Sequence, residues 1–257
     1  MSPSVGLGAI RARGVISELR IRRPAELVIE AIAWYYRVRV HVTPLDGAEA
    51  CVVRRGDHGT VIIRAGLDPG KYRFNLAHEL GHFLVHPDLA LKPCTESDLA
   101  PWAPRPEVER EADDFATNLL LPEEFVAVRL KAKPPSLDFV GELAREFSTS
   151  LTATALRYVE LSGLPCAVVV SSEAGVEWFR VAEGFPGWFE KGRPLHHDSW
   201  AYSALCGEAL PNGMQPVLAT AWFQERRWKD IVIREQAIKL GSYGKALSLI
   251  WVPVQDF

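Results

Sequence analysis

Two histidines and a glutamate in the stretch His78-Glu79-Leu80-Gly81-His82 have the spacing that a metal-dependent hydrolase needs. Residues four apart share one face of a helix, so His78 and His82 can direct one imidazole nitrogen each at the same ion. Glu79 is one residue further round, where its carboxylate can reach a water without binding the metal. The stretch predicts a zinc site with Glu79 as general base, against the alternative of a chance match on an amphipathic helix.

Two histidines leave a tetrahedral zinc short of a protein ligand. A ligand six residues beyond His82 would be Asp88, but Val85 stands where that arrangement needs a glycine turn. The better source is a second helix, which we expect over residues 106–122. That segment has a proline suited to its first turn, acidic residues after it and apolar residues at helical spacing.

Acidic residues of this second helix fall on different faces. Glu109 and Asp113 are one turn apart on the same stripe, so Glu109 can reach the metal while Asp113 supports a ligand imidazole from behind. Glu107 and Glu111 lie off that stripe, and we expect them to be solvated charges at the helix N-terminus.

The two segments together resemble a known family, the ImmA/IrrE family of bacterial metallopeptidases. The resemblance depends on Arg73-Phe74-Asn75-Leu76-Ala77, on the stretch from His78 to His82, and on Glu109-x-x-Ala112-Asp113-x-Phe115-Ala116-x-x-Leu119-Leu120-x-Pro122. One departure is Asn75, which stands where the family usually has threonine.

This resemblance implies both a site and a substrate class. The site would be gluzincin-like, with Zn²⁺ held by His78, His82 and Glu109 and with Glu79 as the catalytic base. The substrates would be helix-turn-helix repressors that bind DNA. Their cleavage would switch on genes of the stress response, of the DNA-damage response, or of phage and mobile-element defence.

Composition places the chain among ordinary globular proteins. It has 257 residues, 48% of them hydrophobic and 24% charged, with a net charge of −3. This charge argues against a surface that coats nucleic acid. Four cysteines, Cys51, Cys94, Cys166 and Cys206, show no paired spacing. The sequence has no signal peptide or membrane-spanning run, so we expect reduced thiols, a cytoplasmic location and no membrane partner.

The segment before the metal-site helix predicts one helix and three strands. We expect the helix over 24–37 and the strands over 38–42, 49–55 and 60–65. In zincin-like proteases an edge strand next to the site receives the substrate backbone, and we infer this role for Val61–Arg64. The alternative is a core strand with both edges covered.

Residues 87–105 are rich in proline and predict a loop between the two helices that carry the ligands. Cys94 lies in this loop. A thiolate at the open position of zinc would displace water, so Cys94 is a candidate inhibitory ligand. An ordinary loop thiol is the alternative.

Residues 136–162 have the pattern of two short helices joined by a turn, as in a helix-turn-helix. Between 129 and 162 there are five Lys or Arg and four Asp or Glu, and Arg157 is the single cation of the second helix. DNA recognition usually needs more contacts, so we favour packing between domains over DNA reading.

From residue 163 onward the chain changes to short β-like segments and contains six of the eight tryptophans. In the family, a C-terminal domain of this size is similar to a GAF-type sensor, which would receive a nucleic-acid, small-molecule or protein signal. A structural cap with an aromatic core is the alternative.

Two polar clusters stand out in this C-terminal part. Arg226, Arg227 and Lys229 lie next to aromatic residues and could hold single-stranded nucleic acid by charge and stacking, although a solvated turn is more common. His196 and His197 lack suitable ligand company, so we expect no metal there.

The sequence as a whole therefore predicts an α/β protein of three parts: a zincin-like metallopeptidase domain (1–128), a helix-turn-helix-like module (129–162) and a C-terminal α/β GAF-like sensor domain (163–257). The predicted activity is that of a zinc endopeptidase. A DNA-binding regulator with a structural zinc site and a small-molecule hydrolase are the alternatives. Glu79 favours an enzyme, because a structural site needs no base.

Overall fold

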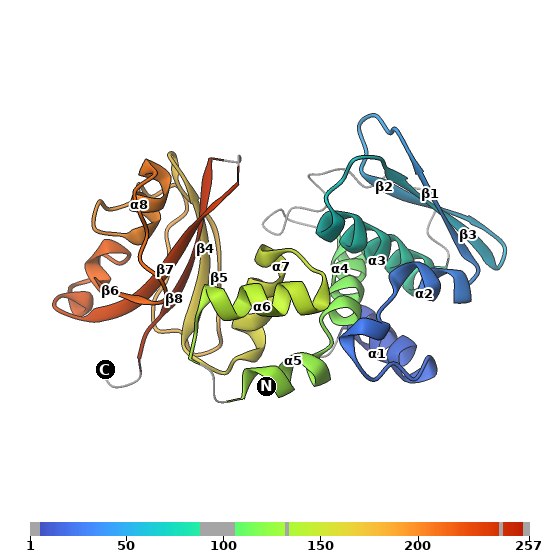
Figure 1. The fold of residues 1–257 in the computed structure, drawn as a ribbon, viewed down its shortest axis with the longest axis horizontal. Coiled ribbons are helices and arrows are strands. Elements are labelled where there is room, and N and C mark those ends of the chain that lie inside the picture. Colours follow the sequence, from blue (N-terminus) through green and yellow to red (C-terminus); the bar gives the residue numbers. More distant parts are fainter. Residues whose placement is uncertain (1–5, 88–105, 132–133, 242–243, 254–257) are drawn as a thin grey trace. The chain divides into compact units, whose positions relative to one another are not determined.

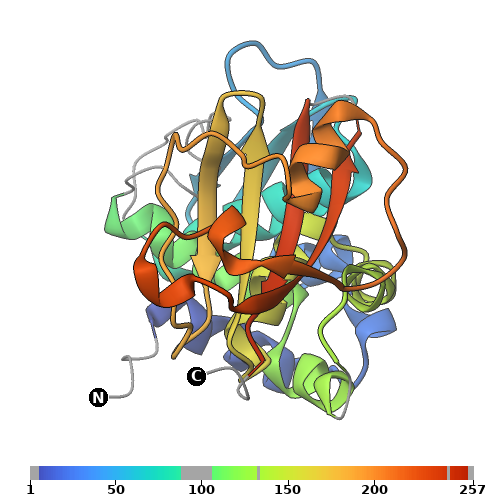
Figure 2. The same cartoon turned by 90° about the vertical axis from the view of Figure 1, so that its left-hand side faces the viewer.

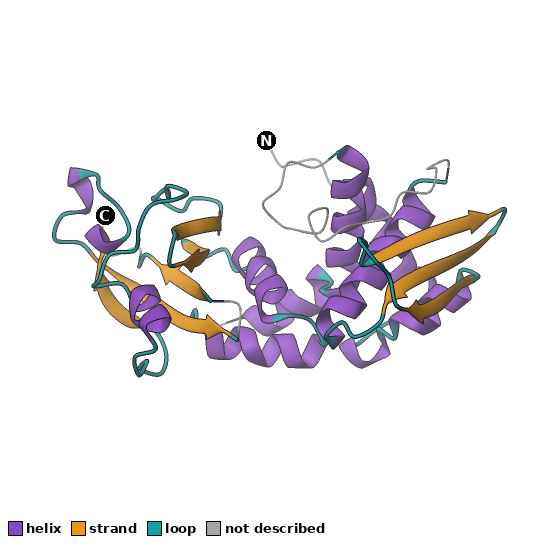
Figure 3. Cartoon of the chain, turned by 90° about the horizontal axis from the view of Figure 1, so that it is seen from above, coloured by secondary structure: helices purple, strands orange, loops and turns teal. Residues whose placement is uncertain are grey.

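The structure is a computed structural model that describes residues 6–87, 106–131, 134–241 and 244–253. The chain forms two compact units. The first comprises residues 1–126 and 144–150, and the second comprises residues 127–143 and 151–257. Both contain helices and one β-sheet, so the expected α/β class is confirmed (Figures 1 and 3).

The first unit consists of a small sheet and the helices that cover one of its faces. Its elements are α1 (Leu7–Glu18), the 3₁₀ turn η1 (Pro24–Glu26), α2 (Ile29–Tyr35), β1 (Val38–Thr43), β2 (Ala50–Arg55), β3 (His58–Arg64), α3 (Pro69–Val85), α4 (Glu107–Leu120) and the start of α5 (Glu123–Leu130). The single helix expected over 24–37 is therefore wrong. The chain makes a 3₁₀ turn, leaves helical geometry at Leu27 and Val28, and resumes as α2.

Strand order corrects the prediction about the edge strand. The order is β1-β3-β2, with β3 parallel to β1 and antiparallel to β2. Val61 pairs with Val40 on one side and with Val52 on the other, so Val61–Arg64 is not an edge segment. β1 lies beside β3 in parallel and pairs with the backbone groups that a substrate would have used. Consequently β2 is an edge of this sheet, and it contacts α3.

α1 packs closely on α4, and this contact depends on a glycine. A Cβ at Gly8 would lie only 1.9 Å from the carbonyl oxygen of Glu111 and 2.8 Å from the backbone nitrogen of Phe115. Only a residue without a side chain lets the two backbones approach so closely. α1 buries small residues for the same reason, among them Ala9 and Ala12.

The second unit is built around a five-stranded antiparallel sheet of order β5-β4-β8-β7-β6, seen in Figure 2. Its elements are the rest of α5, α6 (Leu137–Phe147, whose end groups with the first unit), α7 (Leu151–Leu161), β4 (Cys166–Ser172), β5 (Gly175–Val181), α8 (Trp200–Cys206), β6 (Gln215–Leu218), η2 (Ala219–Ala221), η3 (Arg226–Trp228), β7 (Val232–Leu240) and β8 (Lys245–Trp251). α7 contacts β4 and β5, whereas α8 contacts β7 and β8.

The two helices predicted between 136 and 162 are present as α6 and α7, and α7 packs against the sheet of the second unit. Arg157, the cation that DNA recognition would use, is only 3% exposed and pairs with Glu160 at 2.9 Å. This burial argues against DNA reading by Arg157, whereas packing between domains stays a prediction. Among the described residues, no helix is long and apolar enough to cross a membrane.

Candidate metal centre

α3 brings the two predicted histidine ligands together. The helix begins where the Asp68 side chain caps it by accepting a hydrogen bond from the backbone nitrogen of Lys71, and Pro69 occupies its first position. His78 and His82, one turn apart, are 0% and 3% exposed. Their Nε2 atoms are 3.0 Å apart, so both rings point at one place.

α4 adds a carboxylate to this pair. Glu109 is 1% exposed, and its Oε2 lies 3.4 Å from the Nε2 atom of His78 and 3.4 Å from that of His82. Ligands of a tetrahedral zinc, bound at about 2.0–2.1 Å, are separated by about 3.3 Å. Separations of 3.0, 3.4 and 3.4 Å match that triangle, so these donors fit a zinc ion without rearrangement.

The charge state of Glu109 suits a metal ligand. Burial alone would raise its pKa, but hydrogen bonds from His78 and His82 and the charges of these rings outweigh burial and lower the pKa below its ordinary value. Glu109 is therefore a carboxylate at neutral pH, and a site with one anionic and two imidazole donors is typical of zinc hydrolases.

The Nδ1 atom of each candidate ligand histidine is linked to a carboxylate, directly for His78 and through a third histidine for His82. Asp113 Oδ1 lies 3.0 Å from Nδ1 of His78. On the other ring, Nδ1 of His82 lies 3.2 Å from Nδ1 of His86, and Nε2 of His86 lies 2.8 Å from Oε2 of Glu111. The expectation that Glu111 is a solvated charge is thus wrong, because it is bound by His86, a residue that the predicted site does not include. Glu107 is exposed, as expected.

Glu79, the predicted base, is buried next to the ligand pair and is 1% exposed. The negative charge of Glu79 also acts on Cys51 of β2. Burial, and after it this charge, raise the pKa of the Cys51 thiol. β2 therefore runs close to the predicted base.

A buried charge cluster that no sequence motif predicts fixes α3 to the sheet. Glu49, 1% exposed, is 2.5 Å from Nη2 of Arg64 and 2.7 Å from Nζ of Lys71, and it accepts a hydrogen bond from Nδ2 of Asn75 at 3.3 Å. Lys71, Asn75 and Glu79 follow one another at intervals of four, so they share one face of α3. Asn75, the departure from the family pattern, thus has a structural partner here.

Two other predicted features are the inhibitory cysteine and the basic cluster of the C-terminal part. Cys94 lies outside the described residues. Next to Arg226, Arg227 and Lys229, the aromatic side chains are buried, with Trp228 at 0% and Trp222 at 3% exposure. Rings in the core cannot stack on bases, so the hypothesis of single-stranded nucleic-acid binding at this cluster is wrong.

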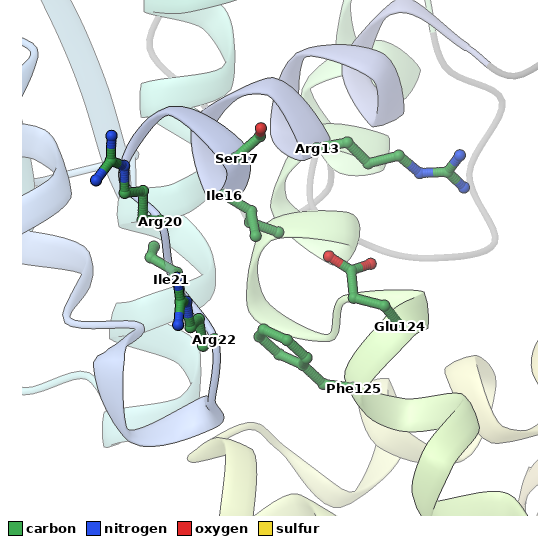
Figure 4. A pocket seen from close by; sticks show the side chains of 8 residues that line it. All are labelled: Arg13, Ile16, Ser17, Arg20, Ile21, Arg22, Glu124 and Phe125. Carbon is green, nitrogen blue, oxygen red and sulfur yellow. The ribbon is translucent and has the colours of Figure 1, made fainter.

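Two further features in the described part of the chain, an exposed histidine cluster and a surface hollow, contain charged or polar side chains. His196, His197 and Asp198 bring three donor atoms within 4.8 Å of one another, so carboxylate company is present after all, but the cluster is exposed. A hollow of about 480 Å³ lies beside α1 and the start of α5 (Figure 4). Its arginines Arg13 and Arg20 point in different directions, and Glu124 adds a carboxylate to the lining.

A comparison of the sequence with known protein families is consistent with a metal site at these residues. The model of the IrrE N-terminal-like domain, a peptidase family, matches residues 26–158, which include all the residues discussed in α3 and α4. No curated protein matches the chain. A solved structure, a Mycobacterium tuberculosis transcriptional regulator, is similar in fold: the TM-score is 0.61 at 17% sequence identity, over 95% of this chain and 76% of that chain. Because the family model matches more than half of the sequence, the chain belongs to the IrrE N-terminal-like family of peptidases.

Proposed function

We propose that this protein is a zinc-dependent endopeptidase that cleaves a helix-turn-helix transcriptional repressor. The observation that carries the proposal is the buried triangle of donor atoms from His78, His82 and Glu109, with Glu79 beside it. A structural zinc site is normally closed by four protein ligands, whereas a catalytic site has three and an adjacent base.

In the proposed reaction each residue has one role. His78, His82 and Glu109 would hold zinc, which when bound supplies the Lewis acidity that polarises a carbonyl and acidifies water. Glu79 would accept the proton of the attacking water at its carboxylate and then deliver it to the amide nitrogen that leaves. Asp113 would hold the His78 ring in place by accepting its Nδ1 hydrogen.

β2 is the strand that we assign to the substrate backbone. It is an edge of the three-stranded sheet, it contacts α3, and its Cys51 lies within the electrostatic reach of Glu79. An extended peptide that pairs with this edge would pass close to the base. The choice of a repressor as substrate rests on the family resemblance, as does the link to stress, DNA-damage or defence genes.

The second unit is a candidate sensor, because it has its own sheet and an aromatic core that includes Phe189, Trp222 and Phe223. We propose that it receives the signal, a nucleic acid or a small molecule, that controls cleavage. Thermal-shift measurements on the full chain with libraries of nucleotides and oligonucleotides test this role. A ligand that shifts the melting temperature and changes cleavage supports it, whereas a ligand that shifts melting without changing cleavage contradicts it.

The proposed activity is tested with the full chain and a candidate substrate, namely any small helix-turn-helix repressor that is encoded next to its gene. The wild type should carry about one zinc per chain by mass spectrometry and should cut the repressor into two fragments. Glu79→Gln should retain zinc and lose cleavage, whereas Glu107→Gln, an exposed change on α4, should behave as wild type. Full zinc in His82→Ala, or cleavage by Glu79→Gln, contradicts the proposal.

The alternative, a DNA-binding regulator with a structural zinc, predicts that the pure protein retards operator DNA in a gel. Burial of Arg157 argues against it. Retardation by wild type and by Glu79→Gln alike, without any cleavage, would favour the alternative.

A further inference from the structure

α3 carries a third histidine in register with the two candidate ligands. His78, His82 and His86 follow at intervals of four, so all three lie on one helix face. His86 is the C-cap residue of α3, and its side chain is 10% exposed. It therefore lies at the end of the ligand row, largely shielded from water.

His86 connects a candidate ligand to a carboxylate of the other helix. Its Nδ1 lies 3.2 Å from Nδ1 of His82, and its Nε2 lies 2.8 Å from Oε2 of Glu111, which is 17% exposed. Both separations are within hydrogen-bond range. The result is a continuous chain, His82 to His86 to Glu111, from α3 to α4.

The protonation of the His82 ring determines which atom donates in each of the two hydrogen bonds of this chain. A His82 ring that offers the Nε2 lone pair to a metal must carry its hydrogen on Nδ1. That hydrogen can only be donated to a lone pair, so Nδ1 of His86 is the acceptor and its hydrogen is on Nε2. Nε2 of His86 then donates to the carboxylate of Glu111, which accepts.

The two candidate imidazole ligands are thus supported in different ways. His78 donates directly to Asp113 at 3.0 Å, whereas His82 reaches its carboxylate through a second imidazole. Both carboxylates belong to α4, and the candidate ligand Glu109 precedes them on the same helix. One helix therefore supplies a ligand and the support for both rings.

We propose that His86 and Glu111 are positioning residues that hold the His82 ring in its metal-binding tautomer and orientation and thereby strengthen metal binding. This inference rests on the proposed metal site. Partners of this kind typically change metal affinity by about 10–100-fold, because they fix the ring and raise the basicity of its ligating nitrogen.

The test uses the full chain and compares three variants with a matched control. Glu111→Gln removes the charge at the end of the chain, His86→Phe removes the connection but keeps a ring, and His86→Gln keeps an oxygen that can accept from His82. Glu107→Gln makes the same change of charge as Glu111→Gln on the same helix, at an exposed residue.

The primary measurement is zinc affinity by competition with a chromophoric chelator. Glu111→Gln and His86→Phe should each weaken zinc binding by about 10-fold or more, His86→Gln should weaken it less, and Glu107→Gln should match the wild type. In addition, ¹⁵N-edited spectra of the zinc-loaded protein should move the His82 Nδ1–H resonance in Glu111→Gln, a change that mere packing would not cause. Far-UV circular dichroism verifies the fold, and if His86→Phe fails to fold, Glu111→Gln and His86→Gln decide.

The outcomes separate this inference from the function on which it rests. A wild type that binds zinc and cleaves by means of Glu79, together with variants whose zinc affinity and His82 resonance equal those of Glu107→Gln, overturns the inference alone. A wild type that binds no zinc overturns the proposed function as well.

Discussion

Gly81 of α3 lies directly against Phe115 of α4. A Cβ built at Gly81 would be 3.1 Å from the Cβ of Phe115 and 3.2 Å from the Cα of Ala112. The glycine inside the His78–His82 stretch thus has a geometric role, because it sets the distance between the helix that carries both histidines and the helix that carries Glu109.

Gly81→Ala should therefore weaken metal binding although it removes no donor atom. The added methyl group must push α4 away by a few tenths of an ångström, and Glu109 would move with α4. We therefore expect zinc affinity to fall by about 10-fold, which is comparable to the effect of mutating a residue that supports a metal ligand. Chelator competition measures this. Gly14→Ala is the control: it lies in α1, its nearest neighbour is an Arg11 side-chain atom at 3.7 Å, and it should leave affinity unchanged and gain roughly 0.5–1 kcal/mol of stability. Equal affinity in both variants would refute the geometric role.

Glu49→Gln should destabilise the first unit. The change removes a buried charge that pairs with Arg64 and Lys71; since both partners are about a third exposed, we expect a cost of roughly 2–3 kcal/mol, at or below the lower end for a fully buried pair. Urea unfolding should show this by circular dichroism, and less by tryptophan fluorescence, because six of the eight tryptophans lie after residue 163.

Asp46→Asn, at an exposed residue near Glu49, is the control and should change stability by less than about 0.5 kcal/mol. A Glu49→Gln variant as stable as Asp46→Asn would show that the cluster contributes nothing.

Glu235 should make the second unit less stable as pH rises from about 4.5 to about 7. Its carboxyl accepts hydrogen bonds from the backbone nitrogens of Trp200 and Ala201, the Trp222 indole and Ser248, yet full burial outweighs these bonds and raises its pKa from 4.5 to about 7. Between these values the folded state holds a proton that the unfolded state has lost, so stability falls with pH, by an amount on the order of a few kcal/mol, and levels off above pH 7.

Tryptophan fluorescence during urea unfolding at several pH values measures this slope. Glu235→Gln cannot titrate and should have a flatter profile, whatever its absolute stability. Parallel profiles for the wild type and Glu235→Gln would contradict the prediction.

Arg157→Ala should lower stability without changing any affinity for DNA. The side chain is 3% exposed and paired with Glu160, so its removal costs roughly 1–3 kcal/mol, whereas it has no access to a phosphate. Arg234→Ala, at an exposed position of β7, is the control for stability. A gel shift that Arg157→Ala abolishes in a folded protein would restore the DNA-reading hypothesis.

The sequence predicted which donor residues lie together better than it predicted their surroundings. His78, His82 and Glu109 could be placed together because helical spacing is a local property and the two motifs are specific. The neighbours that depend on tertiary packing could not: His86 and Glu111 meet only because α3 and α4 cross closely, and nothing in their spacing signals it.

The sequence failed to predict the strand pairing and the packing of α1 for related reasons. The sequence does not say which strands lie on either side of β3, so the prediction places an edge strand where the sheet has its centre. α1 escapes prediction because its buried face consists of Gly8, Ala9, Ala12, Val15 and Ile16, and small residues give little contrast in hydrophobicity. The glycine and alanines at intervals of three and four are the signal that could have revealed it.

The position of α4 between two glycine contacts has a consequence for metal uptake. Gly8 of α1 meets its backbone near Phe115, and Gly81 of α3 meets Phe115 as well, so α4 is fixed by contacts that involve no ion. These contacts would hold the donor atoms of Glu109, His78 and His82 near one another, so the entropy of ordering them would be lost during folding rather than during metal binding.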